Sequence, residues 1–220
     1  MRKDAYFAAP LYIVAAVQFV ICIAVVASRY GPPAYDPATI TISDLQAVNC
    51  GTFQGAYVCS PLHVLANFSV AVLGLLIIAA SLSLRSLFPD GRRRDVAVGL
   101  LVVAGLATML NAFTPEDVTW NGDLVTALVA FLGANFGLIQ MGRTLSKEPW
   151  WRGYDLFSQV LGTIGIAVLI LDGLGLGTVI GTGAIEWLIV APILVWAPTI
   201  GFRLILGKRE QSGTTSMVNR

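Results

Sequence analysis

The chain has 220 residues, of which 56% are hydrophobic and only 12% are charged, and its net charge is +1. Soluble domains carry about 25% charged residues, so this composition excludes an ordinary water-soluble globular protein. Lipid must cover much of the apolar surface, because one aqueous core could not hold it.

Six apolar stretches are long enough, some of them barely, to cross a bilayer as helices, since the hydrocarbon core takes about 20 helical residues. They are 8–28, 62–84, 96–113, 124–141, 156 to about 172, and 187–205. We therefore expect an all-α bundle of six transmembrane helices over residues 8–205. Residues 1–7 form a cytoplasmic N-terminal segment, and residues 206–220 form a flexible cytoplasmic tail.

The distribution of charge supports an even number of helices with both termini in the cytoplasm. Lysine and arginine concentrate on the cytoplasmic side of membrane proteins. With this topology, 13 of the 14 basic residues lie inside, and Arg29 alone lies outside. The outer loops 29–60, 114–123 and 172–186 hold seven acidic residues against that one, a net charge of −6. The basic runs therefore act as topology determinants of a multi-pass plasma-membrane protein, and we expect no nucleic-acid partner.

One alternative concerns the first apolar stretch, which could be a cleaved signal peptide. Val26, Ala27 and Ser28 make a tolerable cleavage site. The apolar run is long for a signal peptide, and Gln18 interrupts it, so we favour a retained helix.

Two of the three cysteines, Cys50 and Cys59, fall in the first outer loop, whereas Cys22 lies inside an apolar run. An oxidising outer compartment permits a Cys50–Cys59 disulfide. Closing a loop of this length stabilises the fold by about 2.5–3 kcal/mol in the chain-entropy model. With a single histidine in the chain, no zinc-binding spacing exists, and we expect neither a metal nor a cofactor.

A candidate polar pocket lies at the outer end of the second helix. His63 and Asn67 are four residues apart and share a helix face. Together with Ser43, Asp44 and Asp123 they could line an outward-facing pocket. Alternatively, His63 satisfies loop carbonyls, and Asp44 caps a short helix or pairs with His63 or Arg29. For both residues the structural role is the more common one.

Four polar side chains interrupt the predicted spans: Gln18, Asn111, Asn135 and Asp172. The two asparagines and the glutamine are expected to hydrogen-bond between helices. Asp172 follows Leu156 by sixteen residues, roughly 24 Å along a helix. It lies either below the outer interface, where ionisable groups are often functional, or at the water-exposed end of its helix.

Several segments together resemble a known family. They are Ile42–Leu45, Cys50–Gly51, Tyr57–His63 with Asn67, Phe113–Asp117 and Phe131–Asn135. In this pattern the chain resembles the bacterial membrane family catalogued as DUF998, in which Phe113–Asp117 matches a Phe-Pro-Glu-Asn turn. The resemblance implies a six-helix membrane protein of unassigned activity. Where the family often carries histidine, this chain carries Asp123.

The function expected from these features is non-catalytic. The chain would bind a membrane lipid or a partner protein, or assemble as a homo-oligomer, through the outward-facing pocket. A first alternative is a membrane enzyme acting on lipids, with His63, Asp44 and Asp123 as acid–base groups. A second is a small transporter gated around Gln18 and Asp172, although the sequence shows no convincing repeat. Neither a nucleophile elbow nor a His-Glu-x-x-His motif occurs.

The topology predicts that single cysteines introduced at Pro33, Thr119 and Thr182 are all labelled by an impermeant maleimide in intact cells. The reason is that the three loops share the side that holds one basic residue of 14. Labelling of one position without the other two would contradict the six-helix topology.

Overall fold

The computed structural model describes residues 7–88, 90–146, 149–175 and 177–218. Six helices are long and apolar enough to cross a membrane, which confirms the predicted all-α transmembrane fold class. They are α1 (Ala8–Ala27), α2 (His63–Arg85), α3 (Arg92–Asn111), α4 (Trp120–Leu145), α5 (Tyr154–Gly173) and residues Thr182–Gly207 of α7 (Thr182–Val218). The protein is therefore a multi-pass membrane protein.

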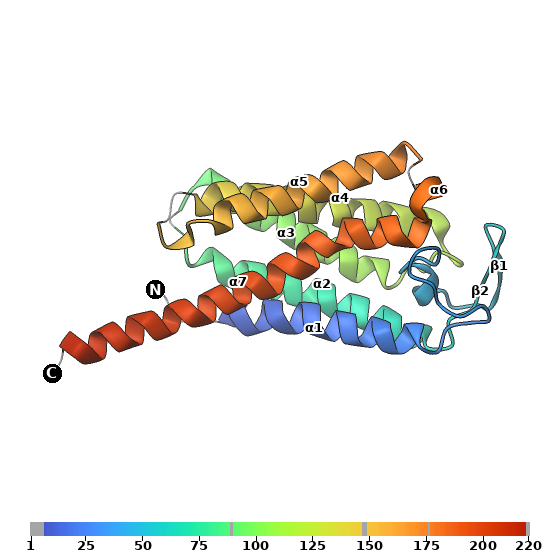
Figure 1. The fold of residues 1–220 in the computed structure, drawn as a ribbon, viewed down its shortest axis with the longest axis horizontal. Helices are drawn as coiled ribbons and strands as arrows, with labels where there is room; N and C mark the ends of the chain where they lie inside the picture. Colours follow the sequence, from blue (N-terminus) through green and yellow to red (C-terminus); the bar gives the residue numbers. More distant parts are fainter. Residues whose placement is uncertain (1–6, 89, 147–148, 176, 219–220) are drawn as a thin grey trace.

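The contacts between the helices form a closed ring. Each helix from α1 to α5 packs on the next along the chain, and α7 closes the ring by packing on both α5 and α1. α7 also contacts α4, so it reaches across the interior of the bundle. Both termini lie at one end of the bundle, and the long loops gather at the other, here called the loop end (Figure 1).

Three helices begin well before their expected positions. α3 begins at Arg92, α4 at Trp120 and α7 at Thr182, which are four, four and five residues before the apolar stretches that identified them. Hydropathy marks the part of a helix that meets hydrocarbon, whereas the polar first turns of these helices are helical too. At its other end α7 continues as helix through Val218, across the segment 206–218 that was expected to be a tail.

Small residues bring the helices into close contact. A Cβ atom on Gly105 of α3 would lie 2.7 Å from the backbone oxygen of Gly74 in α2, and one on Gly201 of α7 would lie 2.7 Å from that of Ala9 in α1. On α4, Gly133 and Gly137 pack against α3. The glycine pair of α4 therefore serves packing inside the bundle, as small residues commonly do between membrane helices.

Polar side chains connect the helices inside the bundle. Gln18 of α1 donates to the Ser69 backbone oxygen of α2 and accepts from the Ser69 hydroxyl, at 3.1 Å each. Trp196 Nε1 of α7 donates to Ser158 Oγ of α5 at 2.8 Å. Gln18 thus has the interhelical role expected of it, because a polar group inside a membrane needs a partner.

The loop between α1 and α2 contains a small hairpin closed by a disulfide. Strands β1 (Gly51–Phe53) and β2 (Ala56–Val58) pair antiparallel, with Gly51 opposite Val58. The predicted Cys50–Cys59 disulfide is present at the base of this hairpin, and Cys22 is a free thiol. The bond closes the hairpin four residues before His63, the first residue of α2.

Candidate functional site

The three long loops are joined to one another at the loop end. Thr182 Oγ1 donates to the Thr39 backbone oxygen at 2.9 Å, and the Ala184 amide donates to the Ala38 oxygen at 3.0 Å. The Asp117 carboxylate accepts the Val48 and Asn49 amides at 3.0 and 2.8 Å. Segments that are far apart in the sequence therefore form one ordered cap over the bundle.

Asp44 acts in this cap as the partner of Thr41. Its Oδ2 accepts both the Thr41 amide and the Thr41 hydroxyl at 2.8 Å, and the Asp44 amide donates back to Thr41 Oγ1 at 2.9 Å. This reciprocal pair begins the short 3₁₀ helix η2 (Asp44–Gln46). The capping role that the sequence suggested for Asp44 is the one that the structure shows, with Thr41 as its partner.

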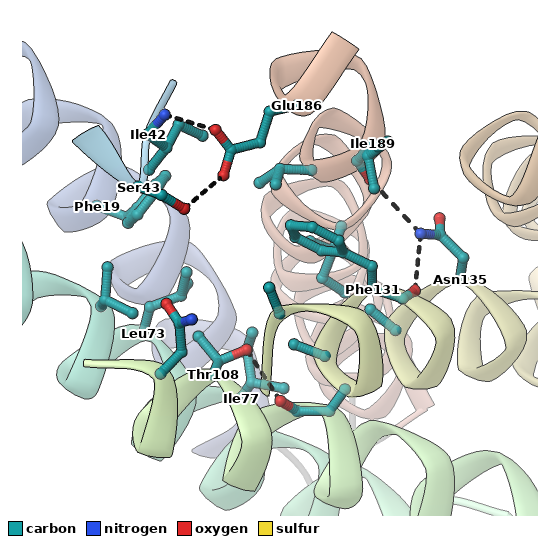
Figure 2. A pocket seen from close by; sticks show the side chains of 18 of the residues that line it. Phe19, Ile42, Ser43, Leu73, Ile77, Thr108, Phe131, Asn135, Glu186 and Ile189 are labelled. Atoms are coloured by element: carbon teal, nitrogen blue, oxygen red, sulfur yellow. Dashed lines mark hydrogen bonds between the residues drawn. The ribbon is translucent and has the colours of Figure 1, made fainter. Parts of the chain in front are cut away.

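Glu186, in the second turn of α7, holds the start of the same segment. Its Oε2 accepts the Ile42 amide at 2.6 Å and its Oε1 accepts the Ser43 hydroxyl at 3.2 Å (Figure 2). Both donors are uncharged. α7 thus positions the first loop through a carboxylate that has no basic partner among the described residues.

A chain of amide side chains connects the cap to α4. Asn111 Nδ2 of α3 donates to Asp123 Oδ1 at 2.8 Å, and Gln46 Nε2 donates to Asn111 Oδ1 at 3.3 Å. Asn67 of α2 in turn donates to the Gln46 backbone oxygen at 3.1 Å. Three residues expected from the sequence, Asn67, Asn111 and Asp123, therefore lie in one network, which the buried Gln46 completes.

Glu116 is one of three residues of this site that sequence reasoning missed; the other two are Gln46 and Glu186. Its side chain is only 6% exposed, although it lies in a loop. Burial raises the pKa of the Glu116 carboxyl to about 10, and a hydrogen bond with the Asp44 carboxyl adds to that rise. Acidic loop residues are normally solvated, so the sequence signal was weak. The one signal present was its place in the Phe113–Asp117 turn that carries the family resemblance.

His63 is separate from these carboxylates. Its Nδ1 lies 3.0 Å from the Ser60 backbone oxygen, and the side chain is half-buried at the start of α2. Among the described residues, no hydrogen bond or ion pair joins His63 to Asp44 or Asp123, and His63 lines neither cavity described below. Its observed contact is the loop-carbonyl contact that was the structural alternative.

Asn135 and Asp172 are two further residues that the sequence singled out. Asn135 Nδ2 donates to the Phe131 backbone oxygen at 2.9 Å and to the Ile189 oxygen of α7 at 3.5 Å (Figure 2). Asp172 lies in the last turn of α5 and is exposed. Of the two alternatives for Asp172, the structure shows the one in which it stands at the end of its helix.

Two adjoining cavities lie beneath and beside the cap. The first, of about 70 Å³, lies among α1, α2, α3, α4 and α7 (Figure 2). Its wall along the bundle is mostly apolar, with Leu73, Ile77 and Leu101, although Thr108 and Asn135 also line it. Ser43, Gln46 and Glu186 line it at the loop end. It is therefore a pocket with one polar end and one apolar end.

The second cavity, of about 210 Å³, lies between α4, α5 and α7 and is rich in carboxylates. Glu116, Asp123, Asp172 and Glu186 line it. The two cavities share a wall made by Ser43, Ala127, Phe131, Glu186 and Ile189. Of the residues of the predicted outer pocket, Ser43 and Asp123 thus line a cavity. Asp44 and Asn67 line neither cavity, but they hydrogen-bond to two residues that do, Thr41 and Gln46.

Carboxyl groups dominate the polar part of the second cavity. No lysine, arginine or histidine is among the residues that line either cavity. Within the described part of the chain, no three His, Cys, Asp or Glu side chains are placed to hold a metal ion together. The walls offer hydrogen-bond acceptors at the loop end and apolar contact deeper in the bundle.

Comparison with known proteins gives one match. A family described as "protein of unknown function (DUF998)" matches residues 13–203. The chain belongs to this family. No curated protein and no solved structure matches it. The match includes four of the six membrane helices completely and most of the first and the last, so this DUF998 protein is an integral membrane protein whose activity has to be argued from the site itself.

The buried Glu116 predicts a stability that falls as pH rises. Because its folded-state pKa of about 10 exceeds the unfolded value, the folded protein holds an extra proton across that interval. Stability is highest on the acid side and is lost towards pH 10, with a slope of at most about 1.4 kcal/mol per pH unit. In Glu116→Gln, which keeps the shape and cannot ionise, this part of the slope disappears.

The measurement is thermal unfolding in dodecyl maltoside between about pH 6 and pH 9, where a single group of raised pKa contributes over the whole range. The melting temperature of the wild-type protein should fall more steeply with pH than that of Glu116→Gln. Equal slopes would contradict a protonated Glu116.

Proposed function

We propose that this protein binds a single membrane lipid at the loop end, with the polar group of the lipid in the acidic cavity and part of its chain in the apolar one. The observation that carries the proposal is the pair of adjoining cavities with a common wall at Glu186 and Phe131. An amphipathic ligand matches a site that is polar at one end and apolar at the other.

The position of the cavities relative to the bilayer supports a lipid as the ligand. Trp120, Leu124 and Leu128 line the second cavity and are 42%, 50% and 43% exposed. These residues form the outer side of α4, which faces lipid in a membrane. A lipid can therefore enter the second cavity sideways from the bilayer without crossing the ordered cap.

The volumes limit how much of the ligand is enclosed. A cavity of about 150 Å³ holds one benzene molecule, so the first cavity, about 70 Å³, admits only a few methylene groups. The remainder of the lipid lies along the exposed leucines of α4. Partial enclosure suits a protein that recognises one lipid among many in the membrane and does not extract it.

Filling the shared wall should abolish lipid retention. Ala127 lines both cavities, so Ala127→Phe places a ring where the ligand passes between them. The matched control is Val129→Phe, which adds the same ring two residues away on a 39% exposed side chain that lines neither cavity. Retained lipid should fall by about tenfold or more in the first variant, a loss of roughly 1.4 kcal/mol in binding.

Native mass spectrometry of protein extracted in a mild detergent measures the retained lipid directly. The wild-type protein and Val129→Phe should each carry one bound lipid. If Ala127→Phe folds with an unchanged melting temperature and still carries the same lipid, the cavities are not its binding site.

A further inference from the structure

Three buried oxygen atoms of cavity-lining residues lack a hydrogen-bond donor within the described part of the chain. One of them, Asn135 Oδ1, lies beside Gly165 of α5. The other two are Glu116 Oε1 and Gln46 Oε1, whose side chains are 6% and 4% exposed. Glu116 lines the second cavity and Gln46 lines the first. Buried acceptors are normally satisfied, so each vacant acceptor calls for a donor supplied by a ligand.

The orientation of Gln46 is fixed by its neighbours. Its amide nitrogen is committed to Asn111, because the nitrogen of Asn111 is itself committed to the Asp123 carboxylate. The oxygen of Gln46 therefore remains an acceptor. A ligand that presents only acceptors, such as a phosphate or a carboxylate, could satisfy neither vacant atom.

The charges around the cavities also favour a ligand that carries hydrogen-bond donors. Four carboxyl side chains line the second cavity, and no basic side chain lines either one. The ion pairs of the described residues, formed by Arg85 and Arg94 with Asp90 and Asp95, lie at the opposite end of the bundle. Carboxylates in a medium of low polarity attract a cation strongly.

Aromatic side chains add a further contact for a cation. Trp120 and Phe131 both line the second cavity, beside its carboxylates. The face of an aromatic ring attracts an ammonium group, and this attraction grows when water is excluded. Acceptors, carboxylates and ring faces together make a site for a group that is positively charged and rich in N–H donors.

We infer that the polar group bound in the acidic cavity is an ammonium group, so that the ligand is a long-chain amine or a lipid that ends in a free ammonium. This inference rests on the proposed function and names its ligand class. The ammonium lies against Glu186, which borders both cavities, and the adjoining chain passes Phe131 into the apolar cavity. A lipid whose headgroup is only anionic is repelled.

Four ligands separate the headgroup from the chain: dodecylamine, dodecanol, dodecanoate and butylamine. Binding is measured by native mass spectrometry titration of the purified protein in dodecyl maltoside, whose headgroup is uncharged. Dodecylamine should bind roughly tenfold or more tightly than dodecanol, since a hydrogen bond to a charged group contributes more than a neutral one. Dodecanoate should bind more weakly than dodecanol, and butylamine more weakly than dodecylamine.

The variant Glu186→Gln assigns that preference to the cavity. It keeps an oxygen acceptor and removes the negative charge of the carboxylate that borders both cavities, so the advantage of dodecylamine over dodecanol should shrink towards unity while dodecanol binding is unchanged. Asp36→Asn is the control, because it removes a carboxylate at the same end of the bundle that lines neither cavity and that bonds, among the described residues, Ala38 and Thr39.

The outcomes are distinguishable. Equal binding of dodecylamine and dodecanol, or a preference that survives in Glu186→Gln, overturns the inference and leaves a lipid site without charge selectivity. Butylamine binding as tightly as dodecylamine supports the ammonium site and contradicts a lipid ligand, in favour of a small organic cation. If no amine binds to folded protein, the ammonium inference is wrong.

Discussion

The structure depends on how the loop end accommodates carboxyl groups away from water without a positive partner. Burying a charge is costly unless it is paired and hydrogen-bonded. Here Glu186 accepts a backbone amide and a hydroxyl, Asp123 accepts an asparagine amide, and Glu116 has a raised pKa. Every observed donor is neutral, so the site keeps its attraction for a cation from outside the chain.

The helical frame makes this arrangement possible. Glycines let α2, α3 and α4 approach closely, and Gln18, Ser69, Ser158 and Trp196 connect helices within the bundle. Because α7 contacts α1, α4 and α5, it sets Glu186 between the first loop and the two cavities. The disulfide, and the hydrogen bonds that the Asp117 carboxylate accepts from the Val48 and Asn49 amides, hold the loop that supplies Ser43 and Gln46. A rigid cap over a ring of helices therefore defines the site.

Hydropathy and charge placement were enough to predict the six helices, because membrane spans are long and apolar. The disulfide followed from two cysteines in one outer loop. The site was predicted only in part: Asp123, Asn111 and Ser43 were named, whereas Glu116, Glu186 and Gln46 were not. Which loop side chains become buried depends on contacts such as Thr182 with Thr39, between residues 143 apart in the chain. No local pattern reports such contacts, so the acid in the loop looked solvated and His63 looked central.

The central claim is that the two adjoining cavities hold one cationic amphiphile, with its charge at the carboxylates. A crystal structure grown from lipidic cubic phase, using protein extracted without delipidation, tests it most directly. The account predicts elongated density that begins within hydrogen-bonding distance of Glu186 and Glu116 and continues past Phe131 into the apolar cavity. Cavities closed by their own side chains, or a headgroup bound instead at the opposite, basic end of the bundle, would contradict it.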